Sequence, residues 1–206
     1  MTRTRLTRAE SKARTRAMLL DAARQVFLER GYHRTSLEAV AEEAGFSIGA
    51  VYSAFASKAD LFFAVFDLRV EERTRQMEEI GAGAASAVEQ GEELARQFVA
   101  VTKHDPHWSL LIVEFWAHAA RDPELRRRFA LRHDALKQAV AGVIEKMLAR
   151  TGQRLGLELE HLAMTAIALG NGFTLERLTH PDGVPDELFP RLSALIMNAL
   201  IQDEQS

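Results

Sequence analysis

The residues with the clearest potential for recognition chemistry lie in the short run SIGAVYS at positions 47–53. A helix is predicted from Ile48 to about Ala54, because the apolar residues recur at helical spacing on one side. The residues predicted to face outward are Ser47, Gly49, Ala50, Tyr52 and Ser53. All except the tyrosine are small, and a helix with a small-residue face can lie close to the base edges in a major groove of DNA.

Local rules also predict the elements that position this face. Thr35 followed by Glu38 has the pattern of a capping box, which predicts a helix from here to about Ala44. Gly45 can adopt the left-handed conformation that commonly follows a helix, and Ser47 can cap the next helix. Two helices joined by a glycine turn also occur in many all-α cores, so this pattern alone leaves both interpretations open.

The flanking residues make the pattern more specific. The run AGFSIGAVYSAFASKADLF at residues 44–62 resembles the DNA-binding segment of the TetR family of bacterial transcriptional regulators. The residues that match the family pattern are Gly45, Ser47, Gly49, Tyr52, Phe55, Lys58 and Leu61. Phe46 is bulkier than the valine usual there. A preceding helix at residues 12–30 and the link GYHRTS extend the resemblance to residues 12–63, and beyond residue 63 it is only architectural.

The resemblance implies a set of DNA contacts and a mode of action. Tyr52 and Lys58 would contact phosphates, and the small outward residues would influence sequence preference. The predicted DNA-binding residues are Thr35, Ser36, Ser47, Ile48, Gly49, Ala50, Tyr52, Ser53 and Lys58. The implied protein is a homodimer that binds a palindromic double-stranded DNA operator, most simply a repressor that a small molecule releases. The alternative is a DNA-binding regulator or architectural protein without a small-molecule effector.

The charge is divided unevenly along the chain. Residues 1–60 hold ten Lys or Arg against seven Asp or Glu, so they carry +3 and the other 146 residues carry −6 of the net −3. The first eleven or so residues are predicted to form a disordered basic arm, which could follow a phosphate backbone or enter a minor groove. The alternative is a solvated tail.

Composition is that of a globular protein with a sizeable core. Hydrophobic residues make up 47% of the 206 residues, and no apolar run approaches the length of a membrane span. The N-terminal sequence lacks the apolar segment of a secretory signal, and the chain has no cysteine and therefore no disulfide framework. We therefore expect a cytoplasmic protein with no membrane association.

The remainder of the chain has helical patterns throughout. Caps at Ser57, Asp105-Pro106 and Asp122-Pro123 predict the starts of successive helices. No run alternates with period two over enough residues to predict a strand. The predicted fold is all-α with about nine helices. Its predicted domains are an arm and helix-turn-helix domain at residues 1–56 and an effector-binding and dimerisation domain at residues 57–206.

The last two predicted helices, at about 158–179 and 188–202, carry wide apolar faces. Wide faces of this kind favour a symmetric four-helix interface made by the same two helices of each subunit. The resemblance favours the same arrangement, since family members pair through their final two helices. The alternative is that both faces are buried within one chain.

The predicted effector site draws on large side chains in the second half of the chain. An apolar pocket with a few polar groups suits a small apolar or aromatic ligand. The apolar candidates are Trp108, Phe115, Trp116, Phe129, Met164, Ile167 and Phe173, and the polar candidates are Thr102, His118, His133 and Asn171. Trp108, Phe115 and Trp116 are seven and eight residues apart and are predicted to line one wall. An ordinary core also needs aromatic residues.

The sequence contains no motif for a metal site or for enzymatic activity. His104 and His107 span a predicted helix start, and the zinc-binding pattern His-Glu-x-x-His is absent. The sequence also contains no P-loop, no Gly-x-Ser-x-Gly and no cysteine nucleophile. We therefore predict no enzyme, no metal and no cofactor.

Overall fold

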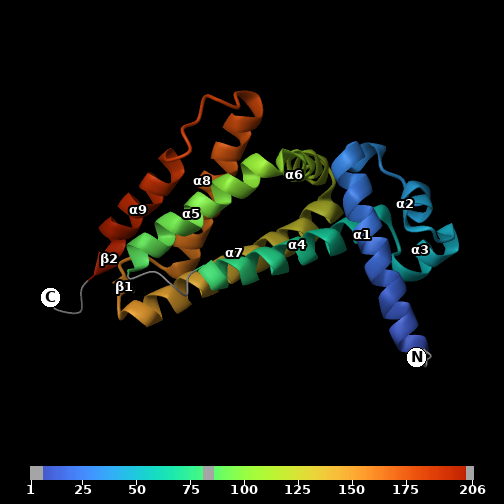
Figure 1. Ribbon diagram of the computed structural model, residues 1–206, viewed down its shortest axis with the longest axis horizontal. Coiled ribbons are helices and arrows are strands. Elements are labelled where there is room, and N and C mark those ends of the chain that lie inside the picture. The colour runs from blue at the N-terminus through green and yellow to red at the C-terminus, as the bar shows by residue number, and fades with distance from the viewer. Residues whose placement is uncertain (1–6, 81–85, 203–206) are drawn as a thin grey trace, which may run out of the picture. The chain divides into compact units, whose positions relative to one another are not determined.

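A computed structural model describes residues 7–80 and 86–202, and within those ranges it contains nine helices and two short strands (Figure 1). The all-α prediction is therefore confirmed. The helices are α1 (Arg8–Arg34), α2 (Leu37–Ala44), α3 (Ile48–Ala54), α4 (Lys58–Ile80), α5 (Ala87–His104), α6 (Pro106–Ala119), α7 (Pro123–Thr151), α8 (Leu159–Thr179) and α9 (Leu188–Leu200). The strands are β1 (Arg154–Leu155) and β2 (Ile201–Gln202).

The residues divide into two packing units, and the division runs through three helices. The first unit contains the chain up to Arg69 together with Leu110–Arg126, and the second contains Val70–Ser109 and the chain from Arg127 onward. The first half of α4 and most of α6 thus pack with α1–α3. The sequence-based boundary at residue 56 concerns function and stays a prediction.

Helix α1 begins earlier than the sequence predicted. Thr7 is its N-cap, and Thr7 and Glu10 form a complete capping box, in which the Thr7 side chain accepts from the Glu10 backbone N–H and the carboxylate accepts from the Thr7 N–H. The prediction of a disordered arm is therefore wrong for residues 7–11, where the capping box favours the helix. Residues 1–6 of that arm lie outside the described part of the chain.

The predicted capping box at Thr35 is also wrong. Ser36 is the N-cap of α2 and accepts a hydrogen bond from the Ala39 backbone N–H at 3.2 Å. The Thr35 hydroxyl instead donates to the backbone oxygens of Val26 and Gly31, at 3.3 and 2.7 Å. Thr35 is consequently buried and ties the end of α1 to the start of α2.

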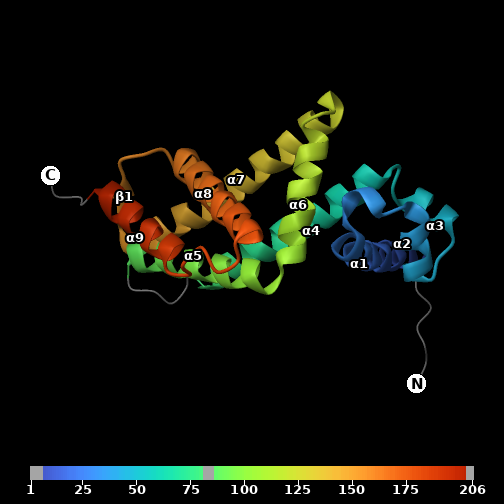
Figure 2. The ribbon, with the colours of Figure 1, turned by 90° about the horizontal axis from the view of Figure 1, so that it is seen from above.

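A short turn joins α2 to α3 (Figure 2), and its residues have the predicted conformations. Gly45 has φ 67° and ψ 30°, the left-handed conformation, and its N–H bonds to the carbonyls that end α2. Ser47 is the N-cap of α3 and accepts from the Ala50 N–H at 3.3 Å. The predicted bounds of α3 are confirmed.

The core of the first unit is built from stacked aromatic rings of α1, α4 and α6. The Phe62 and Phe115 rings stack with centroids 3.9 Å apart, and the Tyr32 ring meets both edge-on at 5.4 and 4.9 Å. Phe27 and Phe63 complete the cluster, and all but Tyr32 among these five are fully buried. Aromatic pairs in these geometries contribute beyond their buried area, so α6 is firmly attached to the end of α1.

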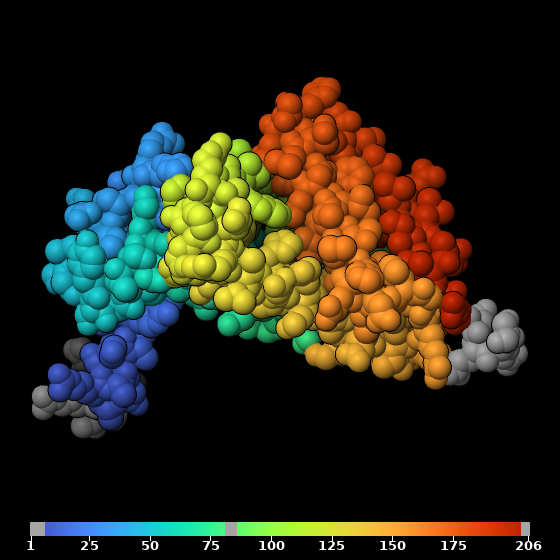
Figure 3. Space-filling view, turned by 180° about the vertical axis from the view of Figure 1, so that it is seen from behind, coloured from blue at the N-terminus to red at the C-terminus, as the bar shows by residue number. Residues whose placement is uncertain are grey.

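In the second unit, α5 packs against α8 and α9, and the last two helices lie at its surface (Figure 3). Ser86 caps α5, and Asp122 caps α7 by accepting from the Glu124 and Leu125 N–H groups. One apolar cluster joins α5, α7, α8 and α9, and a second surrounds Phe189. Both clusters are assembled from helix faces with apolar residues at helical spacing.

The sequence did not predict the two strands. Arg154 pairs with Gln202 and Leu155 with Ile201 in an antiparallel ladder that closes the end of the second unit. Each strand has only two residues, too few for a period-two pattern to appear, and their pairing partners are nearly fifty residues apart. Within the described ranges, no single helix has both the length and the apolarity to cross a bilayer. Only the bent pair of α3 and α4, counted together, meets that test.

Candidate nucleic-acid interface and effector site

The outward face of α3 is open to solvent. Tyr52 is 56% exposed, and Ser47, Gly49 and Ser53 are exposed as well, whereas Ala50 is half-buried. Val51 is fully buried and anchors the helix. Ile48, another of the predicted DNA contacts, is 36% exposed. The structure thus brings the predicted base-facing residues together on one accessible surface.

Two predicted DNA contacts have other partners in this structure. Thr35 is 2% exposed, and its hydroxyl is used inside the unit. The Lys58 ammonium donates to the backbone oxygens of Tyr32, His33 and Thr35, at 2.9, 3.3 and 2.9 Å. A lysine has three N–H donors, so all of its hydrogen-bonding capacity is directed at the end of α1.

The Lys58 side chain also lies 4.5 Å over the Tyr32 ring, a cation–π contact. Burial lowers the pKa of Lys58, while the Coulombic attraction of the Glu114 carboxylate opposes that shift. In the conformation described here, Lys58 holds the α1–α2 link in place.

Glu114 on α6 is a functional candidate that sequence reasoning missed. Its carboxylate accepts from the backbone N–H groups of Tyr32 and His33, at 2.9 and 2.8 Å. It packs so closely on Gly31 that a Cβ built there would lie 2.5 Å from Glu114 Oε2. Glu114 and Lys58, which carry opposite charges, therefore both bind the backbone of the same α1–α2 link: Glu114 binds its N–H groups and Lys58 binds its carbonyl oxygens. A signal was present, because Glu114 is the one charged residue in the apolar run LLIVEFWA.

The predicted effector residues do not form one group. Phe115, Trp116 and His118 belong to the first unit, and the other candidates belong to the second. Phe115 is fully buried in the aromatic core, whereas Trp116, its neighbour, is 38% exposed. The His118 ring packs against the Tyr32 and His33 rings, with centroids 5.1 and 4.8 Å away. These contacts are the ordinary core contacts that the sequence left as the alternative.

Among the candidates in the second unit, Phe173 has the most suggestive surroundings. Its ring lies 5.5 Å from Phe189, which in turn lies 5.7 Å from Phe98, so α5, α8 and α9 share an aromatic cluster. Thr102 donates its hydroxyl to the α5 backbone. The remaining candidates are Ile167 and Asn171, half-buried on α8; Trp108, half-buried at the start of α6; and Met164, 48% exposed on α8.

Phe129 and His133 form a separate pair on α7, with ring centroids 6.4 Å apart. Burial lowers the pKa of His133, and the nearby Lys137 ammonium acts in the same direction. Both effects favour the neutral imidazole, in which one ring nitrogen can accept a hydrogen bond.

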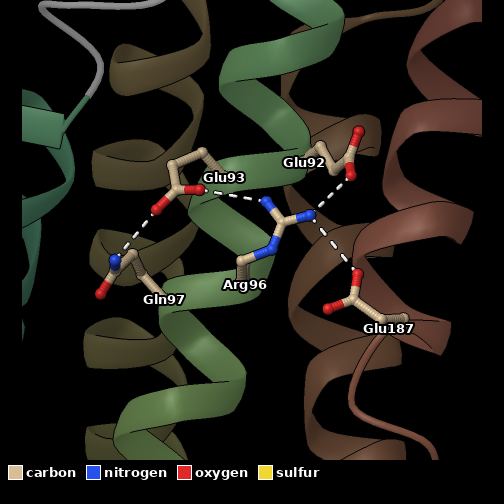
Figure 4. A network of polar contacts seen from close by, with 5 residues as sticks. All are labelled: Glu92, Glu93, Arg96, Gln97 and Glu187. Atoms are coloured by element: carbon tan, nitrogen blue, oxygen red, sulfur yellow. Dashed lines mark hydrogen bonds and ion pairs between the residues drawn. The ribbon is translucent and has the colours of Figure 1, made fainter.

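A polar groove of about 480 Å³ runs between α5 and the loop before α9. It is lined by Arg96, Val99, Ala100, Lys103, His104, Asp186 and Glu187. Arg96 pairs with Glu92, Glu93 and Glu187, at 2.7, 3.1 and 3.4 Å (Figure 4). The hydrogen bonds that the Arg96 guanidinium donates to Glu92, and then to Glu93, raise the pKa of Arg96.

Asp186 joins this groove to the interior of the unit. It bonds to Lys103 at 2.8 Å on the groove side and to the Arg177 Nη2 atom at 3.3 Å on the other side. The Lys103 hydrogen bond lowers the pKa of Asp186, so the carboxylate is ionised at neutral pH. Arg177 is buried on the inner face of α8, and its Nε atom has no hydrogen-bond partner among the described residues. Sequence reasoning did not single out these residues, because no motif links them and Lys103 lies 83 positions before Asp186.

Comparison with known proteins identifies the family. Residues 19–65 match the family described as bacterial regulatory proteins, tetR family, and residues 87–201 match the BetI-type transcriptional repressor C-terminal domain. The chain belongs to the TetR family of transcriptional regulators. The predicted resemblance is confirmed, and the family is one of regulators rather than enzymes. No group of three or more potential metal ligands occurs in the ranges 7–80 and 86–202.

Curated relatives agree with this assignment. The chain is 29% identical to the uncharacterised regulator YfiR of Bacillus subtilis over 59% of this chain and 62% of that protein. It is 26% identical to the transcriptional activator FasR of Mycolicibacterium smegmatis over 75% of this chain and 66% of that protein. The chain thus spans less than two thirds of the length of these relatives.

Solved structures share the fold at low identity. A TetR-family regulator from Mesorhizobium loti has a TM-score of 0.74 at 22% identity and covers 96% of this chain and 100% of its own. FadR of Bacillus subtilis, solved with stearoyl-CoA, has a TM-score of 0.68 at 17% identity, and the match covers 88% of this chain and 96% of FadR. A regulator from Saccharomonospora viridis, solved with choline, has a TM-score of 0.65 at 19% identity, and the match covers 93% of this chain and 100% of that regulator. These similarities establish the fold of the present chain.

Proposed function

We propose that this TetR-family regulator is a homodimeric repressor that binds a palindromic operator and releases it when a small lipophilic molecule binds the second unit. The observation that carries the proposal is the exposed small-residue face of α3, held on a unit whose geometry is fixed by the Lys58 and Glu114 contacts. Ser36, Ser47, Ile48, Gly49, Ala50, Tyr52 and Ser53 are its proposed DNA contacts. Thr35 is buried and would contribute indirectly, by orienting the link between α1 and α2 through its hydroxyl hydrogen bonds.

Lys58 has two possible roles in this proposal. Its three carbonyl contacts support a structural role, and a phosphate contact would require it to give up at least one of them. A phosphate contact contributes to the salt dependence of DNA binding, whereas a structural contact does not. The two roles can therefore be separated by measurement.

Exposed apolar side chains on α8 and α9 support the proposed dimer. Met164 is 48% and Leu175 is 47% exposed on α8, and Leu188 is 39% and Leu195 is 64% exposed on α9. The exposed α8 residues are eleven apart, which places them on one face of the helix. Large apolar side chains gathered on adjacent surface helices mark an interaction site, and a two-fold pair of such faces would bury them. Two reading helices could then occupy successive major grooves.

The proposal of an apolar effector rests on the second unit. Stearoyl-CoA and choline are the molecules in the FadR and Saccharomonospora viridis structures, so ligands of different chemistry are found on this fold. Here the aromatic cluster of Phe98, Phe173 and Phe189 supplies an apolar environment beside the polar groove. The alternative is a DNA-binding regulator without a small-molecule effector.

The test begins with selection of DNA fragments from a random pool by the purified protein. We expect a near-palindromic consensus, with one dimer bound in a shift assay. A panel of lipophilic compounds is then scored for release of that DNA and for repression in transcription in vitro. Selection of no consensus would refute the DNA-reading role. A consensus with no releasing compound would favour the alternative without an effector, and increased transcription would indicate an activator.

A further inference from the structure

Arg177 is a buried cation whose hydrogen bonding is incomplete. The Arg177 side chain is 9% exposed, and its only ion pair among the described residues is the 3.3 Å contact between Nη2 and Asp186. The neighbouring Nε atom is buried and makes no hydrogen bond within the described residues. A buried guanidinium is costly unless its donors are used, so an unused Nε at this position calls for an explanation.

The unused atom lies on the edge of the guanidinium that suits a carboxylate. Nε and Nη2 donate in parallel, and a carboxylate that uses both makes a bidentate pair, the strongest arrangement available to arginine. Asp186 reaches only Nη2, and at a distance longer than the usual range for a charged pair. Asp186 therefore occupies half of a site that a better-placed anion could fill.

Asp186 is also able to leave. Its side chain is 51% exposed and lies in the loop between α8 and α9, where its second partner, Lys103, is equally exposed. The exposed Lys103–Asp186 pair contributes little to stability, and an incoming anion would take over the charge that Asp186 supplies to the buried Arg177. The groove between α5 and this loop gives a ligand a route to the same position.

We propose that Arg177 and Lys103 bind the anionic head group of the effector, a carboxylate on an apolar chain, in place of Asp186. Val99 lines the groove and packs in the aromatic cluster around Phe189, so an apolar chain can extend from the carboxylate toward that cluster. A cationic head group is disfavoured, because it would meet two positive charges once Asp186 has moved away. This inference rests on the proposed function, which assigns a lipophilic effector to the second unit.

The experiment uses three probes with the same ten-carbon chain: decanoate, decanol and decyltrimethylammonium. Binding to the full-length protein is measured below the micelle-forming concentration by calorimetry and by thermal shift. We expect decanoate to bind at least about tenfold more tightly than the other two, since charged hydrogen bonds of this kind contribute roughly a factor of ten to a hundred. Arg177→Gln should remove that preference.

Asp186→Asn should change the affinity for decanoate in the opposite direction to Arg177→Gln. Removing the competing carboxylate frees both cations, so decanoate should bind more tightly by about tenfold, while the affinity for decanol stays unchanged. Glu78→Gln is the matched control, because it removes the carboxylate of another exposed ion pair of the second unit, Glu78 with Lys146 at 2.6 Å, away from the groove. That variant should bind all three probes as the unaltered protein does.

Several results would overturn the inference. These are equal binding of the three probes, binding of none of them, or unchanged or weaker binding of decanoate to Asp186→Asn. Because Asp186 is exposed, the last result decides the question even if Arg177→Gln fails to fold. Operator selection on the same protein separates the two proposals. A protein that binds operator but not decanoate loses only this inference, and one that binds decanoate through Arg177 but selects no DNA loses only the repressor function.

Discussion

Gly31→Ala should destabilise the first unit through two separable effects. Gly31 has φ 76° and ψ 174°, a region of backbone conformation that is nearly exclusive to glycine. A Cβ at this position would also lie 2.5 Å from Glu114 Oε2. The first effect comes from the backbone alone, and the second depends on the Glu114 side chain.

The expected magnitude follows from these two effects. Strain in a sparsely populated backbone region costs about 1–3 kcal/mol. Moving the carboxylate away leaves the half-buried Tyr32 N–H without its 2.9 Å partner, which costs about 1–3 kcal/mol more. The free energy of unfolding should therefore fall by about 2–6 kcal/mol, and Tm by about 4–24 °C for a protein of this size.

Thermal unfolding followed by circular dichroism is the assay, with operator affinity measured in parallel. Gly142→Ala is the matched control, because Gly142 lies inside α7 with no atom within 4 Å of an added Cβ. That substitution should raise stability by up to about 1 kcal/mol, since alanine favours a helix over glycine.

A double-mutant cycle with Glu114→Ala separates the two effects. Removing the carboxylate relieves the clash but not the backbone strain, so Gly31→Ala should cost about 1–3 kcal/mol less in the Glu114→Ala background. The reasoning is refuted if Gly31→Ala leaves Tm unchanged, or if its cost is the same in both backgrounds.

Three further substitutions test the proposed function. Leu195→Asp should yield folded monomers that no longer bind the operator, because an unpaired charge in the dimer interface costs several kcal/mol. The control is the same change at Leu131, which is 70% exposed on α7 and should leave the dimer intact. A Leu195→Asp protein that sediments as a dimer would contradict this interface. Lys58→Met should lower Tm by several degrees and leave the salt slope of DNA binding unchanged, whereas a slope reduced by about one with normal Tm would establish a phosphate contact. Tyr52→Ala should change stability by less than about 0.5 kcal/mol but weaken operator binding in a shift assay, and unchanged binding would remove Tyr52 from the interface.

Several elements were predictable from sequence because their causes are local. Gly45 ends α2 and Ser47 begins α3 through hydrogen bonds to residues within four positions along the chain. Asp105 and Asp122 likewise cap α6 and α7 through contacts within three residues. Interactions of this range depend on residue type and spacing, and these are written in the sequence.

Other predictions failed where two residues compete for one role. Thr35 and Ser36 are both good N-caps, and the sequence favoured Thr35 because Glu38 follows at the right spacing. The choice is made by α1, whose Val26 and Gly31 carbonyls accept the Thr35 hydroxyl and leave Ser36 to cap α2. No local pattern records that competition.

The sequence by itself determined the family, the all-α fold and the outward small-residue face of α3. Only the tertiary structure decided that Phe115 is core rather than pocket, that Glu114 and Lys58 hold the link after α1, and that Arg177 is buried beside Asp186. Caps and helix periodicity act over a few residues, whereas these contacts join residues of different helices. Their energies depend on burial and on partner geometry, which arise only when the helices pack together.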